Sequence, residues 1–210
     1  MSKQSKTPSA REQRLAEARK QGLSIGIASG TYGISFGALS IAAGLDLWQT
    51  MAMSLLLFTG GSQFALVGII ASGGSSVTAV ATSTLLGIRN GLYGLQLARV
   101  LRLLGWRRAA AAHLTIDEST AVALAQEQPE VQRTGFWAAG LGVYAFWNLS
   151  TLVGALVGNA IGDPRVWGLD AAAAAAFVAL IWPRLKDRTG QVTAALAAVI
   201  ALISFAPMPA

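Results

Sequence analysis

Long apolar runs separated by short polar stretches make up most of this chain. Six apolar stretches cover approximately residues 22–45, 48–72, 76–98, 134–161, 166–183 and 191–206. A helix needs about 20 residues to cross a hydrocarbon core about 30 Å thick, so the first four are long enough, the fifth is slightly short and the last is marginal. The pattern predicts an all-α, polytopic transmembrane helical bundle with about 5–6 spans.

Basic residues cluster in two places that we expect on the same side of the membrane, because Lys and Arg favour cytoplasmic loops. The first cluster is the polar tail 1–21, with Lys3, Lys6, Arg11, Arg14, Arg19 and Lys20. The second comprises Arg99, Arg102, Arg107 and Arg108. Three apolar stretches separate the clusters, and three crossings cannot return the chain to its starting side. At least one segment is therefore predicted to be broken or re-entrant, unless the second cluster is an exception to the bias.

The stretch 48–72 is the favoured place for this fold-back. Its middle carries the polar run Thr59–Gln63, and its adjacent residues Gly60 and Gly61 each cost about 1 kcal/mol in a helix interior. We predict two half-helices that meet at an unwound point, and a re-entrant hairpin here would remove one crossing. The alternative is a continuous helix whose glycines pack against a neighbour.

The stretch 76–98 is the other candidate, because Gly87–Gly91 interrupts it and includes Arg89. A charged side chain at mid-membrane costs roughly 2.5–3.5 kcal/mol on insertion scales. Helical spacing places Thr82, Tyr93 and Gln96 on the same face as Arg89, so this face is expected to line a wet cavity or the bundle interior. The alternative is that Arg89 extends from near a helix end to the membrane surface.

The long connection 99–133, expected to be cytoplasmic, holds the densest ionisable cluster. Its stretch 109–125 is apolar enough for a helix and carries His113, Asp117 and Glu118. His113 and Asp117, four residues apart, would share a helix face, and transporters use such groups as proton relays. The alternative is a capping box in which Thr115 caps a helix and Glu118 reaches back. Either carboxylate could also neutralise Arg89 if the chain folds back.

Composition narrows the classes of function. The chain has 53% hydrophobic and 12% charged residues and a mean hydropathy of +0.52, whereas soluble domains have roughly 25% charged residues. The net charge of +6 does not indicate nucleic-acid binding, because the basic residues flank apolar runs. Zero cysteines and a single histidine argue against thiolate and zinc sites, and no catalytic motif is present. We expect no cofactor and no enzyme, but one integral membrane domain over 22–210, preceded by a short helix of the tail at the inner surface.

Four motifs together resemble the AzlC family in their order and spacing. They are Gly33–Ala38, Thr59–Phe64, Ile88–Gly94 and Leu114–Ser119, and the resemblance covers roughly residues 20–205. That family comprises the azaleucine-resistance, branched-chain amino acid permeases. The resemblance implies a secondary transporter that exports branched-chain amino acids across the bacterial plasma (inner) membrane, driven by the proton motive force. It also implies a small AzlD-type membrane subunit as partner, and the charge bias places the N-terminus in the cytoplasm.

A zwitterionic substrate needs positive groups for its carboxylate and polar acceptors for its amine. The candidate substrate-binding residues are Gly60, Gly61, Ser62, Gln63, Phe64, Arg89, Asn90 and Tyr93. Asp117, Glu118 and His113 are candidates for proton coupling or charge pairing, and Phe36, Phe64 and Tyr93 for an apolar pocket. Family members usually have His where this chain has Asn90, and Asn cannot take up a proton. They also tend to continue with another apolar stretch beyond Ala210. A membrane scaffold without transport, or an exporter of another small solute, are the alternative functions.

Overall fold

The computed structural model describes residues 9–161, 178 and 182–204, and within these ranges the chain is helical and contains no strand. The chain divides into two compact units, residues 1–173 and 174–210. The described part of the second unit holds a short 3₁₀ helix, Trp182–Lys186, and the helix α10, Arg188–Ser204. The predicted apolar stretch 166–183 lies almost entirely outside the described residues. The all-α prediction is confirmed, and the number of spans stays a prediction.

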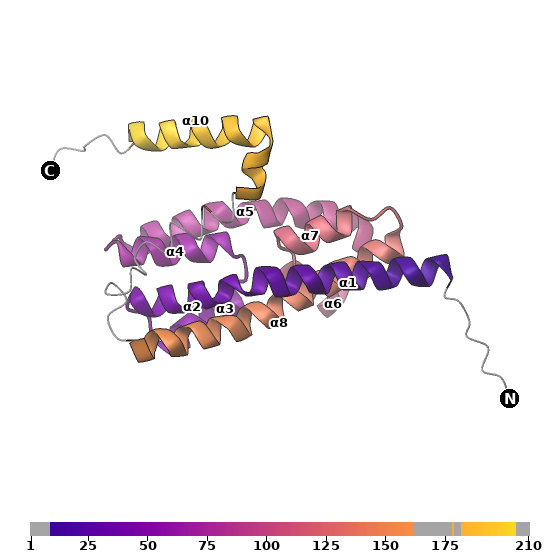
Figure 1. Ribbon diagram of the computed structural model, residues 1–210, viewed down its shortest axis with the longest axis horizontal. Helices are drawn as coiled ribbons and strands as arrows, with labels where there is room; N and C mark the ends of the chain where they lie inside the picture. Colours follow the sequence, from indigo (N-terminus) through magenta and orange to yellow (C-terminus); the bar gives the residue numbers. More distant parts are fainter. Residues whose placement is uncertain (1–8, 162–177, 179–181, 205–210) are drawn as a thin grey trace. The chain divides into compact units, whose positions relative to one another are not determined.

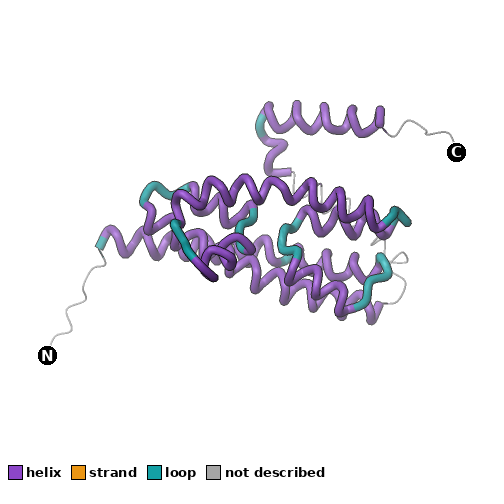
Figure 2. The backbone as a smooth tube through the Cα atoms, turned by 180° about the vertical axis from the view of Figure 1, so that it is seen from behind, coloured by secondary structure: helices purple, strands orange, loops and turns teal. Residues whose placement is uncertain are grey.

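The first unit contains the hairpins and long helices that form the candidate site (Figure 1). Its helices are α1 Ala10–Gly30, α2 Tyr32–Ala42, α3 Leu47–Leu56, α4 Gly61–Ala71, α5 Ser76–Leu101, α6 Gly105–His113, α7 Asp117–Leu124 and α8 Pro129–Ile161. Figure 2 shows loop segments part-way along the bundle as well as at its ends. Helices that stop inside the bundle are therefore a property of this fold.

A glycine seam joins α1 and α2 to α8, which runs parallel to them (Figure 1). A Cβ atom added at Gly22 would lie 2.7 Å from the Ala139 nitrogen, and one at Gly26 would lie 2.8 Å from the Gly142 carbonyl carbon. Side chains are excluded at these positions because the two backbones touch, which is how small residues serve membrane helix pairs. The seam continues along α2 through Gly37, whose added Cβ would lie 2.1 Å from the Thr151 oxygen.

The same seam changes the interpretation of the tail. Residues 10–21 were expected to form a separate short helix at the inner surface, but they are the beginning of α1. Ser9 and Glu12 form a capping box at its start, and Ala18 is buried in the bundle. Residues 10–21 and the start of the apolar run thus form one continuous helix, which already contacts α8 at its start, where Arg11 pairs with Glu130.

The stretch 48–72 is broken, as predicted, and its two halves form a hairpin. Helix α3 runs from the end of α2 to mid-bundle, where Phe58 contacts the ring of Tyr144. Gly60 then reverses the chain with a φ of 62°. Helix α4 returns alongside α5 to the end at which α3 began (Figure 1). Helix α5 itself continues unbroken through Gly87–Gly91, so the second candidate interruption is not a break.

The connection 99–133 is a second hairpin rather than a polar loop. Helix α6 runs to mid-bundle, residues 114–116 turn the chain, and α7 returns. The turn is held against α8, because Leu114 and Ser119 both lie next to Gly140 and Val122 lies next to Gly135. The single helix expected over 109–125 is therefore divided at its middle.

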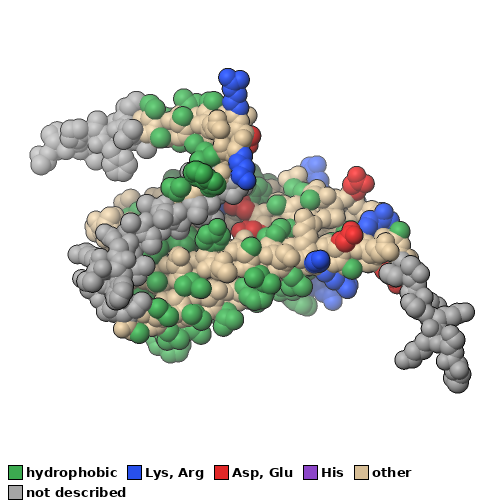
Figure 3. Space-filling view, in the orientation of Figure 1, with side chains coloured by type: hydrophobic (Ala, Val, Ile, Leu, Met, Phe, Trp, Pro, Cys, Tyr) green, Lys and Arg blue, Asp and Glu red, His purple; other side chains and the backbone are tan. Residues whose placement is uncertain are grey.

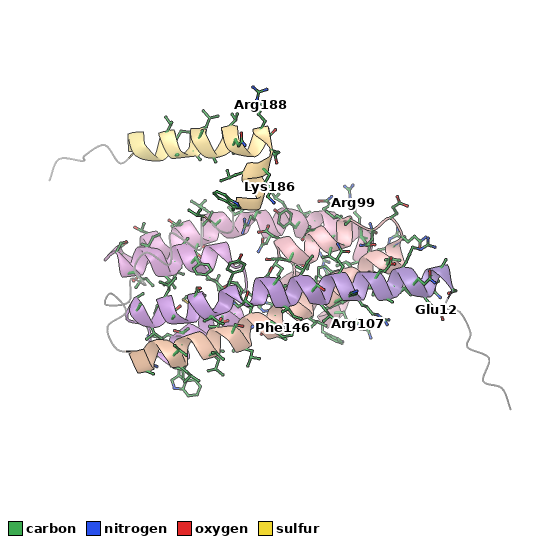
Figure 4. The ribbon with its side chains drawn as sticks, viewed as in Figure 1. Glu12, Arg99, Arg107, Phe146, Lys186 and Arg188 are labelled. Atoms are coloured by element: carbon green, nitrogen blue, oxygen red, sulfur yellow. The ribbon has the colours of Figure 1, made fainter. Side chains whose placement is uncertain are left out.

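Charge is segregated along the first unit. Arg11 pairs with Glu130 where α1 and α8 begin, and Figure 4 places Glu12, Arg99 and Arg107 toward the same end. We call this the basic end; Figure 3 shows the charged side chains gathered toward it. The described residues of the two basic clusters thus share one end of the bundle, as the fold-back argument requires. Two helical segments in the described residues are long and apolar enough to cross a membrane: Ala10–Ala42, which is α1 and α2 taken together, and Pro129–Ala160 in α8.

The first unit contains the same arrangement twice in succession: a hairpin of two short helices followed by a long helix. The two copies start from opposite ends of the bundle. The first hairpin, α3–α4, starts from the end opposite the basic end and is followed by α5, which runs to the basic end (Figure 1). The second hairpin, α6–α7, starts from the basic end and is followed by α8, which runs away from it. Inverted repeats of this kind bring broken helices from opposite sides to one level of the bundle.

Candidate binding site between the hairpin tips

An ion pair at mid-bundle links the second hairpin to α5. The Arg89 Nη2 atom lies 3.0 Å from the Asp117 Oδ2 atom, and the two side chains are 40% and 30% exposed. Arg89 comes from the middle of α5, and Asp117 is the first residue of α7. The predicted neutralisation of Arg89 by a carboxylate is therefore confirmed for Asp117. Arg89 does not extend to a helix end.

The first hairpin meets the same arginine from the other side. A Cβ added at Gly61 would lie 3.4 Å from the Arg89 Nη2 atom. The Ser62 Oγ atom faces Gly87, at 3.8 Å from where that residue's Cβ would be. Helices α4 and α7 thus both begin beside Arg89, and a helix N-terminus carries partial positive charge from its free N–H groups. Two helix N-termini and a guanidinium converge on one region.

Buried polar atoms without hydrogen-bond partners among the described residues gather there too. They include Thr59 Oγ1, Ser62 Oγ, Arg89 Nε, Asn90 Oδ1 and Asp117 Oδ1. Buried polar groups in folded proteins are nearly always paired, so each exception calls for an explanation. Donors and acceptors from both tips and from α5 are available here for a polar ligand.

Glu118 extends the polar region toward α1. Its carboxyl group interacts with the Ser29 hydroxyl and experiences the charges of Asp117 and Arg89. The two neighbouring carboxylates therefore have different surroundings: Asp117 faces α5, and Glu118 faces α1. A site with two carboxylates and one guanidinium can hold a cationic group and an anionic group at the same time.

Gln63 holds the first hairpin together. Its side chain is fully buried, its Oε1 atom accepts from the Gly60 N–H at 3.1 Å, and its Nε2 atom donates to the Met53 carbonyl at 3.1 Å. Gln63 therefore ties the start of α4 to the end of α3. The unwound segment is 57–60, slightly earlier than predicted, and Gly61–Gln63 form the first turn of α4.

The capping box proposed for the second tip is wrong by one residue. The Thr115 hydroxyl donates to the Ala111 carbonyl at 2.7 Å, so it closes α6 instead of opening α7. The Ser119 Oγ atom accepts from the Ile116 N–H at 3.1 Å and donates to the Leu114 carbonyl at 2.7 Å. Glu118 is therefore not the residue that reaches back to the tip, and its carboxyl group faces Ser29 of α1.

His113 and Asp117 do not share a helix face, because His113 ends α6 and Asp117 begins α7. The His113 ring lies 6.0 Å from the ring of Phe58 and 5.5 Å from that of Tyr144, measured between centroids. These rings join the two tips to α8. Sequence reasoning missed Phe58 and Tyr144, since isolated aromatics in apolar runs carry no distinguishing pattern.

The predicted apolar-pocket residues separate in the structure. Phe64 is buried and contacts Phe36 and Trp147, with ring centroids 5.7 and 6.1 Å away, so these rings form a packed core behind the site. Tyr93 lies one helical turn from Arg89 on α5 and is half-buried. Asn90, its neighbour on α5, is half-buried as well.

The described residues form an all-helical bundle in which two opposed, broken hairpins meet. Membrane proteins tolerate such broken helices where they line a protein-enclosed site. Comparison with known proteins agrees. The AzlC protein family model matches residues 24–161, and the chain belongs to the AzlC family. The resemblance seen in the sequence is thereby confirmed.

Two relatives carry the same description, "Uncharacterized membrane protein". One, from Helicobacter pylori strain 26695, is 27% identical over 83% of this chain and 77% of its own length. The other, from Archaeoglobus fulgidus, is 33% identical over 73% of this chain and 68% of its own length. No solved structure matches the chain.

Proposed function

We propose that this protein exports branched-chain and similar neutral amino acids across the bacterial plasma membrane. The observation that carries the proposal is the meeting of two opposed hairpin tips at the Arg89–Asp117 ion pair. A neutral amino acid carries both charges on adjacent atoms, so it needs one cationic and one anionic partner close together. Broken helices near the bilayer midplane are where secondary transporters bind such substrates.

The residues divide between the two ends of the substrate. Arg89 and the N-terminus of α4 at Gly61 and Ser62 bind the carboxylate, because all of them present N–H or O–H donors to one region. Asp117 or Glu118 accepts the ammonium group. In this arrangement the substrate carboxylate competes with Asp117 for Arg89, so binding breaks the existing ion pair. The alkyl side chain extends toward Tyr93, while Phe64 supports the first tip from behind.

Proton coupling rests on the same carboxylates. An Asp117 freed from Arg89 is exposed to a large change in its electrostatic surroundings, which is the requirement for coupling proton uptake to substrate binding. Export is thus driven by the proton motive force, without a proton carrier at Asn90. A small AzlD-type membrane subunit completes the transporter.

Efflux of labelled leucine from proteoliposomes tests this proposal. The protein is reconstituted with and without the small subunit, and efflux is measured with a proton gradient and after an ionophore has removed it. Gradient-dependent efflux is expected. No flux with the partner present would identify a non-transporting scaffold. Flux that unlabelled leucine, isoleucine and valine fail to compete would identify an exporter of a different solute.

Cysteine labelling tests the orientation, since the chain has no native cysteine. Ser75→Cys lies in the turn between α4 and α5, and Arg108→Cys lies in α6 near the basic end. A membrane-impermeant maleimide is expected to label Ser75→Cys in intact cells and Arg108→Cys only after lysis. Labelling of both from one side would contradict the crossing of α5.

A further inference from the structure

A groove of about 580 Å³ lies between α1 and α8, away from the candidate transport site. The glycine seam creates it. Because Gly22 and Gly26 bring the two backbones into contact, the small residues Ala138, Gly142 and Ala145 form an open floor. Larger apolar side chains stand along its sides: Leu23, Trp137, Leu141 and Phe146.

Two arginines lie at one end of this groove. Arg19 of α1 and Arg133 of α8 both line it, and both are exposed. Arg133 donates from its Nε atom to the Val100 carbonyl at 3.2 Å, a bond that does not use its two terminal nitrogens. Neither arginine forms an ion pair within the described residues, whereas the nearby Arg11 is neutralised by Glu130. No acidic residue lines the groove.

The dimensions match half a membrane. The groove extends over 13 residues of α8, from Arg133 to Phe146, which is about 20 Å of helix. Half of a hydrocarbon core is about 15 Å thick. Trp137 lies one turn below Arg133, at the depth where tryptophans prefer the interface. Figure 4 shows Phe146 further along the bundle, away from the basic end. The groove therefore runs from the level of lipid headgroups toward mid-membrane.

We propose that this groove binds an anionic phospholipid, with its phosphate between Arg19 and Arg133 and one acyl chain over Ala138, Gly142 and Ala145. Any lipid would cover an apolar floor, but only an anionic headgroup complements two unpaired guanidiniums. Arginine suits this role because its planar nitrogens pair with phosphate oxygens in bidentate geometry. The site is independent of the transport function.

Native mass spectrometry of the purified protein tests the site, using phosphatidylglycerol and phosphatidylcholine of the same chain length. The variant Arg19→Gln/Arg133→Gln should retain about tenfold less phosphatidylglycerol, with phosphatidylcholine unchanged. The matched control, Arg14→Gln/Arg108→Gln, removes the same charge, one arginine on α1 and one elsewhere, and should retain the lipid. The elution profile in gel filtration verifies that both variants fold.

A second variant tests the floor of the groove. Ala145→Phe fills the groove without altering charge, and phosphatidylglycerol retention should fall while the profile in gel filtration stays the same. Three outcomes overturn the proposal: equal losses in the groove and control doubles, competition by chainless glycerophosphoglycerol as strong as that by the lipid, or loss of the lipid when the small membrane subunit is bound. The last would make the groove a subunit interface.

Discussion

The two hairpins share a construction and differ in chemistry. Each consists of a helix to mid-bundle, a short tip and a returning helix whose third residue accepts a hydrogen bond from the tip: Gln63 from Gly60, and Ser119 from Ile116. The first hairpin, 47–71, has no charged residue. The second, 105–124, places two carboxylates at the start of its returning helix. Arg89, from the helix that follows the first hairpin, pairs with one of them.

This difference separates two tasks that a transporter for zwitterions must perform. A neutral tip offers backbone and hydroxyl donors whose strength does not change with protonation. An acidic tip offers groups that can change charge. The comparison suggests that the first hairpin recognises the substrate carboxylate, while the second binds the amine and the coupling proton. The predictions below test this division, beginning with the arginine that both hairpins approach.

Replacement of Arg89 should have the largest effect, because both tips lose the same partner. Arg89→Gln is expected to lower leucine efflux at least tenfold, which corresponds to about 1.4 kcal/mol of substrate interaction. Arg89→Lys keeps the charge but loses the second terminal nitrogen, so its leucine efflux should lie between that of the parent and that of Arg89→Gln. Arg108→Gln, an exposed arginine of α6, is the matched control. Efflux of Arg89→Gln within twofold of the parent would rule out a shared site.

The acidic tip should control coupling more than binding. Asp117→Asn removes one of the two candidate proton carriers, while the amide oxygen still accepts from an ammonium group. Leucine exchange is expected to persist, and export driven by an imposed pH gradient should disappear. Glu118→Gln, whose parent side chain faces Ser29, shows which carboxylate carries the proton. A dye sensitive to internal pH measures proton movement. Leucine-linked proton movement in both variants would exclude this hairpin from coupling.

The sequence predicted the first hairpin but not the second, and the reason lies in the tips. Gly60 and Gly61 interrupt an apolar run visibly, and the shared end of the two basic clusters required a fold-back nearby. Residues 114–116 contain neither Gly nor Pro, and Trp106, Arg107 and Arg108 make α6 resemble a surface loop. The second break depends on long-range packing of Leu114 against Gly140, which no local pattern contains.

The site was predicted in part for a similar reason. Arg89 is conspicuous because its charge lies inside an apolar run, and a carboxylate partner follows from the cost of burying that charge. Which carboxylate pairs with it depends on the rotation of α7, which the Ser119 cap sets. Phe64 was expected at the substrate but packs with Phe36 and Trp147, because its position in the first turn of α4 directs it toward α2 and α8.

The caps should reveal how differently the two tips are held. Gln63→Ala removes two hydrogen bonds, one of them to α3, and leaves a space where a fully buried side chain stood. We expect the free energy of unfolding to fall by about 2–4 kcal/mol. Ser119→Ala removes a smaller cap whose bonds stay within the tip, and about 1 kcal/mol is expected. Thermal unfolding in detergent measures both. A larger loss for Ser119→Ala would mean that the acidic tip is the more rigid one.

A substitution that changes only the backbone conformation of a tip should have the smallest effect on stability. Gly60 has a φ of 62° and nothing within 4 Å of an added Cβ, so Gly60→Ala tests conformation alone. A loss of about 1–2 kcal/mol is expected. Gly68 lies within α4, with equally open space around an added Cβ and helical dihedral angles, so Gly68→Ala should instead raise the free energy of unfolding by about 0.4–1 kcal/mol. At the second tip Ile116 has a φ of −129° and needs no glycine. An unchanged melting temperature for Gly60→Ala would mean that the first tip relaxes to an ordinary turn. The two hairpins would then be alike in backbone and differ in charge alone.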